Sequence, residues 1–240
     1  MPGPDPSLRN RLSRLHAGRV LDVATGEGRF AHFLAENFGD YTAIVGIDNR
    51  KEPLALARQH NHNPKITFVL MDAAQLTFPD SSFDTVAIAH SLHHLAQPEP
   101  VLSEMKRVLR PDGLFIIAEL FGDNLNPGQK SYELWHSLIA EINTALGITH
   151  KPTFARARLR KIFLRLGLSQ ADIFELPPDA ASAAEAEHMA EFLKRIDRLL
   201  DEVRHHPDYH RFQQRAEELR GRIQEVGIAP PPQLWLIGRK

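Results

Sequence analysis

Residues 20–30 read Val-Leu-Asp-Val-Ala-Thr-Gly-Glu-Gly-Arg-Phe, an apolar run that stops at a turn of small residues. Gly26 and Gly28 let the backbone turn tightly and come close to a ligand. A helical pattern follows, and the N–H groups at a helix N-terminus can bind an anionic group. Asp22 ends the predicted strand, where its carboxylate can hold a cationic amine. This segment therefore predicts a strand, a glycine turn and a helix around a small ligand.

Predicted strands and helices alternate through the first half of the chain. The strands are expected at 20–24, 42–48, 67–71, 85–89 and 114–119, and the helices at 6–16, 28–38, 53–62 and 98–109. Such alternation predicts an α/β fold, a parallel sheet covered by helices on both faces.

The pattern changes after Leu120. Helices are expected at 128–146 and 153–166, strands at 171–176 and 233–239, and a helical insertion at 182–226. The insertion has two apolar stripes, one from Met189 to Val203 and one that includes Phe212 and Leu219. Stripes at steps of three and four predict a seam for an antiparallel helix or for another subunit. A homodimer through the insertion is therefore one expectation.

Acidic residues end three successive strands. Asp48 lies about 20 residues past Gly28, where a carboxylate can accept from two ribose hydroxyls. Asp72 can accept from an adenine amino group, and the small Ala73 lets the base approach the backbone. Together with Asp22, these acids would lie at the edge of an open α/β sheet that binds ligands. For each acid taken singly, the alternative is a turn or a helix cap.

In this order the motifs resemble those of class I S-adenosylmethionine-dependent methyltransferases, in the type 11-like group that acts on small molecules. The resemblance covers residues 19 to about 120. The segments that carry it are Val20–Gly28, Gly46-Ile-Asp48, Met71-Asp-Ala73, Phe78–Asp84, Leu92-His-His-Leu95 and Arg107–Gly113.

The resemblance implies a Rossmann-like, doubly wound sheet of seven strands, mostly parallel with an antiparallel last strand. It also implies methyl transfer from S-adenosylmethionine to a small-molecule acceptor, with release of S-adenosylhomocysteine. One departure is Ala24, where the family usually has glycine; one added methyl should leave binding intact. The implied cofactor-binding residues are Asp22, Ala24, Thr25, Gly26, Gly28, Asp48, Asn49, Asp72, Ala73 and His90.

We expect a single domain over residues 1–240. Its parts are an N-terminal helix (1–18), a cofactor-binding core (19–120), substrate-side helices with the sixth strand (121–181), the helical insertion (182–228) and the last strand (229–240).

Two other functions fit parts of the pattern. Gly26-x-Gly28-x-x-Ala31 also satisfies the dinucleotide fingerprint of NAD-linked oxidoreductases. That alternative gives Asp22 and Asp72 no role in binding. The second half of the chain also lacks the further strand–helix repeats that a nicotinamide half-site needs. A non-catalytic S-adenosylmethionine-binding or scaffold protein, with the helical seam as its working surface, is the second alternative.

Histidines follow the fourth predicted strand, at positions 90, 93 and 94. His90 at the strand end is the candidate base that could deprotonate a methyl acceptor. No metal site is expected, because no carboxylate stands at helical spacing to complete a ligand set.

Acceptor specificity should come from segments outside the common core. Tyr132, Trp135 and His136 are candidates to line an acceptor pocket, since they combine apolar bodies with polar tips. The alternative is that they belong to the hydrophobic core.

The composition narrows the range of partners. The chain has no cysteine, which excludes disulfides and thiolate metal sites, and its formal net charge of −1 argues against nucleic acid. No apolar run approaches the ~20 residues of a membrane span, and the first five residues do not resemble a signal peptide. We expect a cytoplasmic protein without nucleic-acid or membrane partners.

Overall fold

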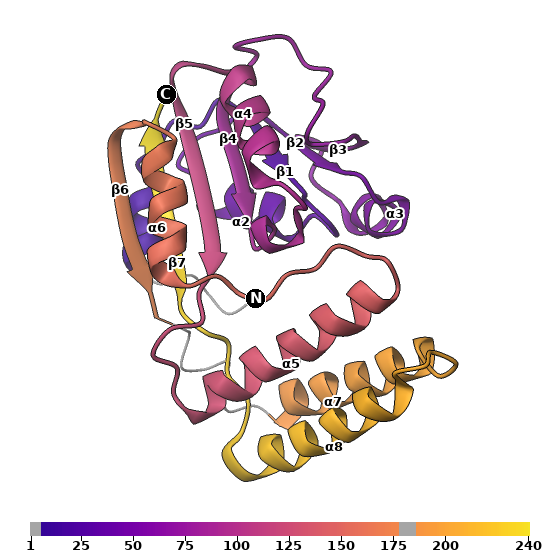
Figure 1. Ribbon diagram of the computed structural model, residues 1–240. Helices are drawn as coiled ribbons and strands as arrows, with labels where there is room; N and C mark the ends of the chain where they lie inside the picture. The colour runs from indigo at the N-terminus through magenta and orange to yellow at the C-terminus, as the bar shows by residue number, and fades with distance from the viewer. Residues whose placement is uncertain (1–5, 178–185) are drawn as a thin grey trace.

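The computed structural model describes residues 6–177 and 186–240. Within these residues, helices cover both faces of a seven-stranded sheet of order β3-β2-β1-β4-β5-β7-β6 (Figure 1). The strands are β1 (Arg19–Val23), β2 (Ala43–Asp48), β3 (Ile66–Leu70), β4 (Phe83–Ala89), β5 (Leu109–Leu120), β6 (Ser169–Leu176) and β7 (Gln233–Arg239). The α-helices are α1 (Pro6–Leu12), α2 (Arg29–Asn37), α3 (Lys51–His60), α4 (Pro98–Val108), α5 (Pro127–Ala145), α6 (Arg156–Arg165), α7 (Ala186–Glu202) and α8 (Tyr209–Val226).

The strand directions confirm the predicted fold class. β1 pairs in parallel with β2 on one side and with β4 on the other, and β5 continues the parallel half. The last strand, β7, lies between β5 and β6 and is antiparallel to both. The sheet is therefore doubly wound, with its strand order reversing between β1 and β4.

Two apolar layers cover the sheet. Helices α1, α2 and α3 pack on one face through buried residues such as Leu12, Leu34 and Leu54. Helices α4 and α6 cover the other face, with Met105 and Phe163 among their buried side chains. These layers bury nearly the whole of β1, β2, β4 and β5, as their continuous apolar runs predicted.

Helices α5, α7 and α8 form a separate layer, here called the helical cap, beside the end of the sheet at which β5 finishes (Figure 1). Helix α5 begins at a capping box, in which the Asn126 side chain accepts from the Gln129 N–H and the Gln129 side chain accepts from the Asn126 N–H. Its apolar face packs against α8, which in turn packs against α7.

The seam predicted in the insertion is filled within the chain. Phe212 and Leu219 are buried against α5 and α7, so another subunit is not needed to cover them. The basis for a homodimer through this seam is therefore removed. The backbone of Met189 lies in α7, but its side chain and the boundary at 181/182 lie outside the described residues.

Several element boundaries differ from prediction. Helix α1 ends at Leu12 rather than near residue 16, and β5 begins at Leu109 rather than at Leu114. Asp112 and Gly113 lie at a bulge in β5, where Asp112 has φ of 60° and the register against β4 shifts. In the described part of the chain, no helix has both the length and the hydropathy needed to cross a membrane.

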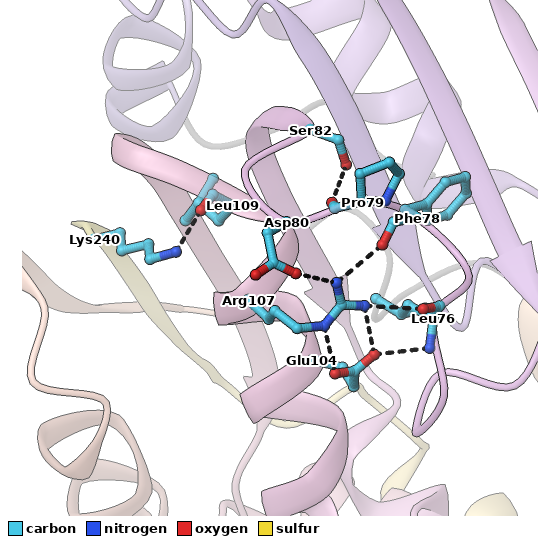
Figure 2. A network of polar contacts seen from close by, with 9 residues as sticks. All are labelled: Leu76, Phe78, Pro79, Asp80, Ser82, Glu104, Arg107, Leu109 and Lys240. Carbon is cyan, nitrogen blue, oxygen red and sulfur yellow. Dashed lines mark hydrogen bonds and ion pairs between the residues drawn. The ribbon is translucent and has the colours of Figure 1, made fainter.

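Arg107 on α4 fixes the loop between β3 and β4 (Figure 2). Its guanidinium makes two hydrogen bonds to Glu104, at 2.8 Å each, and donates to the carbonyls of Leu76 and Phe78, both at 2.9 Å. A further bond of 2.6 Å reaches the Asp80 carboxylate. The planar guanidinium of arginine can donate to all these acceptors at once. These bonds join two segments of the family resemblance, Phe78–Asp84 and the one that begins at Arg107.

We predict that Phe212→Ala lowers the free energy of unfolding by about 3–5 kcal/mol, because it removes a fully buried ring from the helical cap. Leu164→Ala, at a side chain that is 70% exposed on α6, is the control and should change stability by less than about 0.5 kcal/mol. Urea unfolding measures both. Equal effects of the two substitutions would contradict the packing described.

Candidate functional site

The turn after β1 has a left-handed backbone at three positions. Ala24, Gly26 and Gly28 have φ of 55°, 54° and 80°. A Cβ on Gly28 would lie 2.5 Å from the Phe68 ring, so a side chain is excluded there by space as well as by φ. The turn then leads directly into α2, as the sequence predicted.

Asp48 at the end of β2 ties this turn to the neighbouring strand. Its carboxylate accepts from the N–H of Gly26 and from the N–H of Arg50, each at 2.9 Å. The side chain is 7% exposed. Asp48 therefore holds the glycine turn and the start of α3 in fixed positions, while it still borders open space.

That space is a cavity of about 680 Å³ at the carboxyl ends of β1, β2, β3 and β4. Seven of the predicted cofactor residues line it: Ala24, Gly26, Asp48, Asn49, Asp72, Ala73 and His90. The volume lies in the range of small-molecule sites, ~300–1,000 Å³. Four strand-end segments far apart in the sequence thus meet around one cavity.

Asp22, Thr25 and Gly28 are not among the lining residues. Asp22 is fully buried, accepts from the Thr25 hydroxyl, and has a second carboxylate oxygen, Oδ1, that is buried without a hydrogen-bond partner. Burial raises the pKa of Asp22 to about 7, although the Thr25 hydroxyl opposes the shift. These residues shape the turn from inside the protein.

Asp72 and Ala73 lie together just past β3. The Asp72 carboxylate is exposed and accepts from the Ala74 N–H at 2.9 Å. It therefore has acceptor capacity left for a ligand, since a carboxylate offers about four lone-pair sites.

His90, just past β4, also has a left-handed backbone, with φ of 49°. Desolvation by the surrounding protein lowers the pKa of His90 below its ordinary value, against the opposing charge of Glu119. A neutral imidazole at the cavity wall can accept a proton, which is what a general base requires.

Several lining residues were not predicted as part of the cofactor site. Ser91 and His94 follow β4, and Ile148 and Thr149 come from the segment between α5 and α6, far along the chain. Only the packing of the helical cap brings this last segment to the cavity, so no local pattern could have predicted it.

The structure gathers histidines that the sequence left separate. His93 and His94, after β4, lie against His136 of α5 and His150 of the following loop. His93 Nδ1 lies 3.1 Å from the Glu119 carboxylate of β5. Our expectation of no metal site considered only helical spacing, and the tertiary structure shows that this reasoning was too narrow.

The predicted acceptor residues lie in the helical cap and not in the lining of the 680 Å³ cavity. Tyr132 and Trp135 form ring contacts with Phe192 of α7, and Trp135 is 5% exposed. His136 belongs to the histidine cluster. Their role in acceptor binding stays a prediction, and the described contacts are those of core residues.

A doubly wound sheet with a glycine turn after β1, an acid after β2 and a cavity at the strand ends defines a nucleoside-binding class of α/β proteins. Residues 21–117 match the family profile described as the methyltransferase domain. The match covers less than half of the chain, and over these residues it confirms the resemblance to class I S-adenosylmethionine-dependent methyltransferases.

Two of the similar sequences are named as methyltransferases of quinone biosynthesis. The ubiquinone/menaquinone biosynthesis C-methyltransferase UbiE of Geobacter sulfurreducens is 39% identical over 106 residues, 42% of this chain and 41% of the relative. Demethylmenaquinone methyltransferase of Thermus thermophilus is 38% identical over 103 residues, 42% of this chain and 46% of the relative. The chain thus spans less than half the length of these relatives.

Solved structures share the fold over nearly the whole chain. An S-adenosylmethionine-dependent methyltransferase from Mesorhizobium loti has a TM-score of 0.58 at 19% identity, covering 98% of this chain and 96% of its own. Phosphoethanolamine N-methyltransferase 2 of Haemonchus contortus, in complex with S-adenosyl-L-methionine, has a TM-score of 0.58 at 18% identity, covering 98% and 51%. At this identity the likeness shows the fold alone.

We predict that Ala24→Gly raises the free energy of unfolding by up to about 1 kcal/mol. Alanine is disfavoured in the left-handed region by ~1–2 kcal/mol, and part of that gain is offset by the freer unfolded chain. Ala31→Gly in α2 is the control and should lower stability by roughly 1 kcal/mol or more. Urea unfolding of both variants checks the signs, and a loss of stability in Ala24→Gly would contradict the strain.

We also predict a pH dependence from Asp22, whose folded pKa of about 7 exceeds the ordinary 3.8. Between these values the folded state binds more protons than the unfolded state, so stability falls as pH rises. Asp22→Asn removes this contribution. Between pH 5 and pH 8, wild type should lose up to a few kcal/mol more stability than the variant. Urea unfolding at both pH values measures this, and identical slopes would contradict it.

Proposed function

We propose that this protein transfers the methyl group of S-adenosylmethionine to a small-molecule acceptor and releases S-adenosylhomocysteine. The observation that carries the proposal is the cavity at the strand ends, where residues from the glycine turn, β2, β3 and β4 meet. The matched family and the shared fold support the same cofactor.

The cavity residues fit the parts of this cofactor. Asp48 already accepts two backbone N–H groups, but a carboxylate has about four lone-pair sites and can also accept from ribose hydroxyls. Asp72 would accept from the adenine amino group, with Ala73 leaving room for the ring. Gly26 and Asn49 would border the cofactor along the cavity wall.

The sequence suggested that Asp22 holds a cationic amine, but its position in the structure favours another role. Because it is fully buried, we propose that it supports the turn through Thr25 rather than contacting the methionine part directly.

When bound, S-adenosylmethionine supplies an electrophilic methyl group on a cationic sulfur. The chain's own contribution is to position the acceptor in line with that group, which can supply most of the catalysis. His90 lies at the cavity wall with a lowered pKa, so its neutral ring can take a proton from an acceptor hydroxyl or amine.

The acceptor would be selected by the helical cap. Ile148 and Thr149, in the segment that follows α5 of the cap, line the cavity. The sequence relatives match only the core. Since those relatives are named for quinone substrates and a structural neighbour for phosphoethanolamine, demethylmenaquinone and phosphoethanolamine are the first acceptors to test.

The test is calorimetric titration of S-adenosylmethionine, S-adenosylhomocysteine and NAD into wild type and Asp48→Asn. We expect micromolar binding of the first two, and a loss of more than about tenfold in the variant, because a charge-assisted hydrogen bond contributes ~1.5–3 kcal/mol. Glu52→Gln, at an exposed carboxylate on the neighbouring α3, is the matched control and should bind like wild type.

Other outcomes separate the alternatives. Binding of NAD without S-adenosylmethionine would replace the proposal by an NAD-linked oxidoreductase. Cofactor binding without turnover of any acceptor would favour a non-catalytic binding or scaffold protein. If both cofactor and acceptor react, His90→Gln should lower kcat and remove an acidic limb from the pH profile, which would identify the base.

A further inference from the structure

The buried histidine cluster has the composition and shape of a metal site. His93, His136 and His150 are 3%, 5% and 8% exposed, and each offers a ring nitrogen within 4.8 Å of the others. They come from three segments, the short helix after β4, helix α5 and the loop that follows it. Imidazole is a preferred ligand of zinc, copper, iron and nickel.

The ring positions approach those around a tetrahedral ion. The centroids of His93, His136 and His150 are separated by 4.7, 4.8 and 5.5 Å. With Zn–N distances of ~2.0–2.1 Å, rings around one ion lie about 5 Å apart and their ligand nitrogens about 3.3 Å apart. The Nε2 atoms of His136 and His150 are already 3.1 Å apart.

The hydrogen bonds of the cluster leave its Nε2 atoms facing one another. The Nε2 atoms of His136 and His150 are in hydrogen-bond contact, and the Asn143 amide nitrogen, a donor, lies 2.8 Å from His150 Nδ1. His136 Nδ1 remains buried without a partner. An ion on both Nε2 atoms would replace the contact between them and leave the proton of His150 on Nδ1, so the Asn143 amide would turn to place its oxygen, an acceptor, against that N–H.

Glu119 supplies the partner that metal-ligating histidines usually have. Its carboxylate is fully buried and meets His93 Nδ1 at 3.1 Å, while it also accepts from the N–H groups of Leu92 and Leu120. The N–H groups of Leu92 and Leu120 favour the ionised form of this carboxylate. A carboxylate on Nδ1 leaves His93 Nε2 as the ligand atom.

The charges of the cluster also suit a cation. Both His136 and His150 are buried, which favours the neutral imidazole that a metal ligand requires. Arg195 of α7 opposes a cation, since its charge acts on both rings. The ionised Glu119 offsets this repulsion.

We propose that His93, His136 and His150 bind one divalent ion of the zinc class, with water in the fourth position. His94 lies 4.2 Å from the rings of both His93 and His150 and lines the cavity, so the ion would lie one ring away from the cofactor site. The proposal does not depend on methyl transfer.

The test uses the full chain, freed of any histidine tag and treated with EDTA. Zn²⁺ is titrated by calorimetry, and Co²⁺ is followed by its visible absorption, which is strong when the ion is tetrahedral. The variants His136→Gln and His150→Gln keep polar side chains of similar length, and circular dichroism checks that they fold. His210→Gln, at an exposed histidine of α8, is the matched control.

We expect one ion per wild-type chain, a tetrahedral Co²⁺ spectrum, and a thermal midpoint that rises with added Zn²⁺. Both cluster variants should bind more than about tenfold more weakly, and the control should bind like wild type. Absence of Zn²⁺ binding by folded wild type, an octahedral Co²⁺ spectrum, or undiminished binding in the variants would overturn the proposal. The wild-type spectrum decides the question even if a cluster variant fails to fold.

Discussion

The reversal of strand order between β1 and β4 is the constraint on which the rest of the structure depends. Because β1 pairs with β2 on one side and with β4 on the other, the connections from these strands pass over opposite faces of the sheet. Their carboxyl ends are therefore left uncovered, and a crevice opens there. The glycine turn, Asp48, Asp72 and His90 all belong to this edge.

Two charged side chains fix the shape of that edge of the sheet. The Asp48 carboxylate links the turn after β1 to the start of α3, and the Arg107 guanidinium holds the loop that follows Asp72 (Figure 2). Both use charged groups to satisfy backbone N–H or C=O groups in loops, where no ladder can do so. The cavity walls are thus held in place by the protein itself.

The helical cap buries polar side chains against the core. Its apolar seam is buried by α5, α7 and α8, so the cap is a packed unit and not an open docking face within the described residues. Where α5 meets the core, the packing is polar: Glu119, His93, His136 and His150 are buried together. Buried polar groups are unfavourable unless paired, and an unpartnered His136 Nδ1 shows that the pairing is incomplete.

The resemblance to a known family implied the doubly wound class and seven of the residues that line the cavity. The sequence by itself determined the order and kind of the elements, the glycine turn and the acids at the strand ends. Those features are local, since strand periodicity, a glycine turn and an acid at a strand end act within a few residues. Tertiary structure alone decided that Asp22 is buried, that Phe212 packs within the chain, and that Ile148 reaches the cavity. It also brought His136 and His150 to His93. Contacts between distant segments depend on how whole helices pack, and no pattern in one stretch of sequence carries that information.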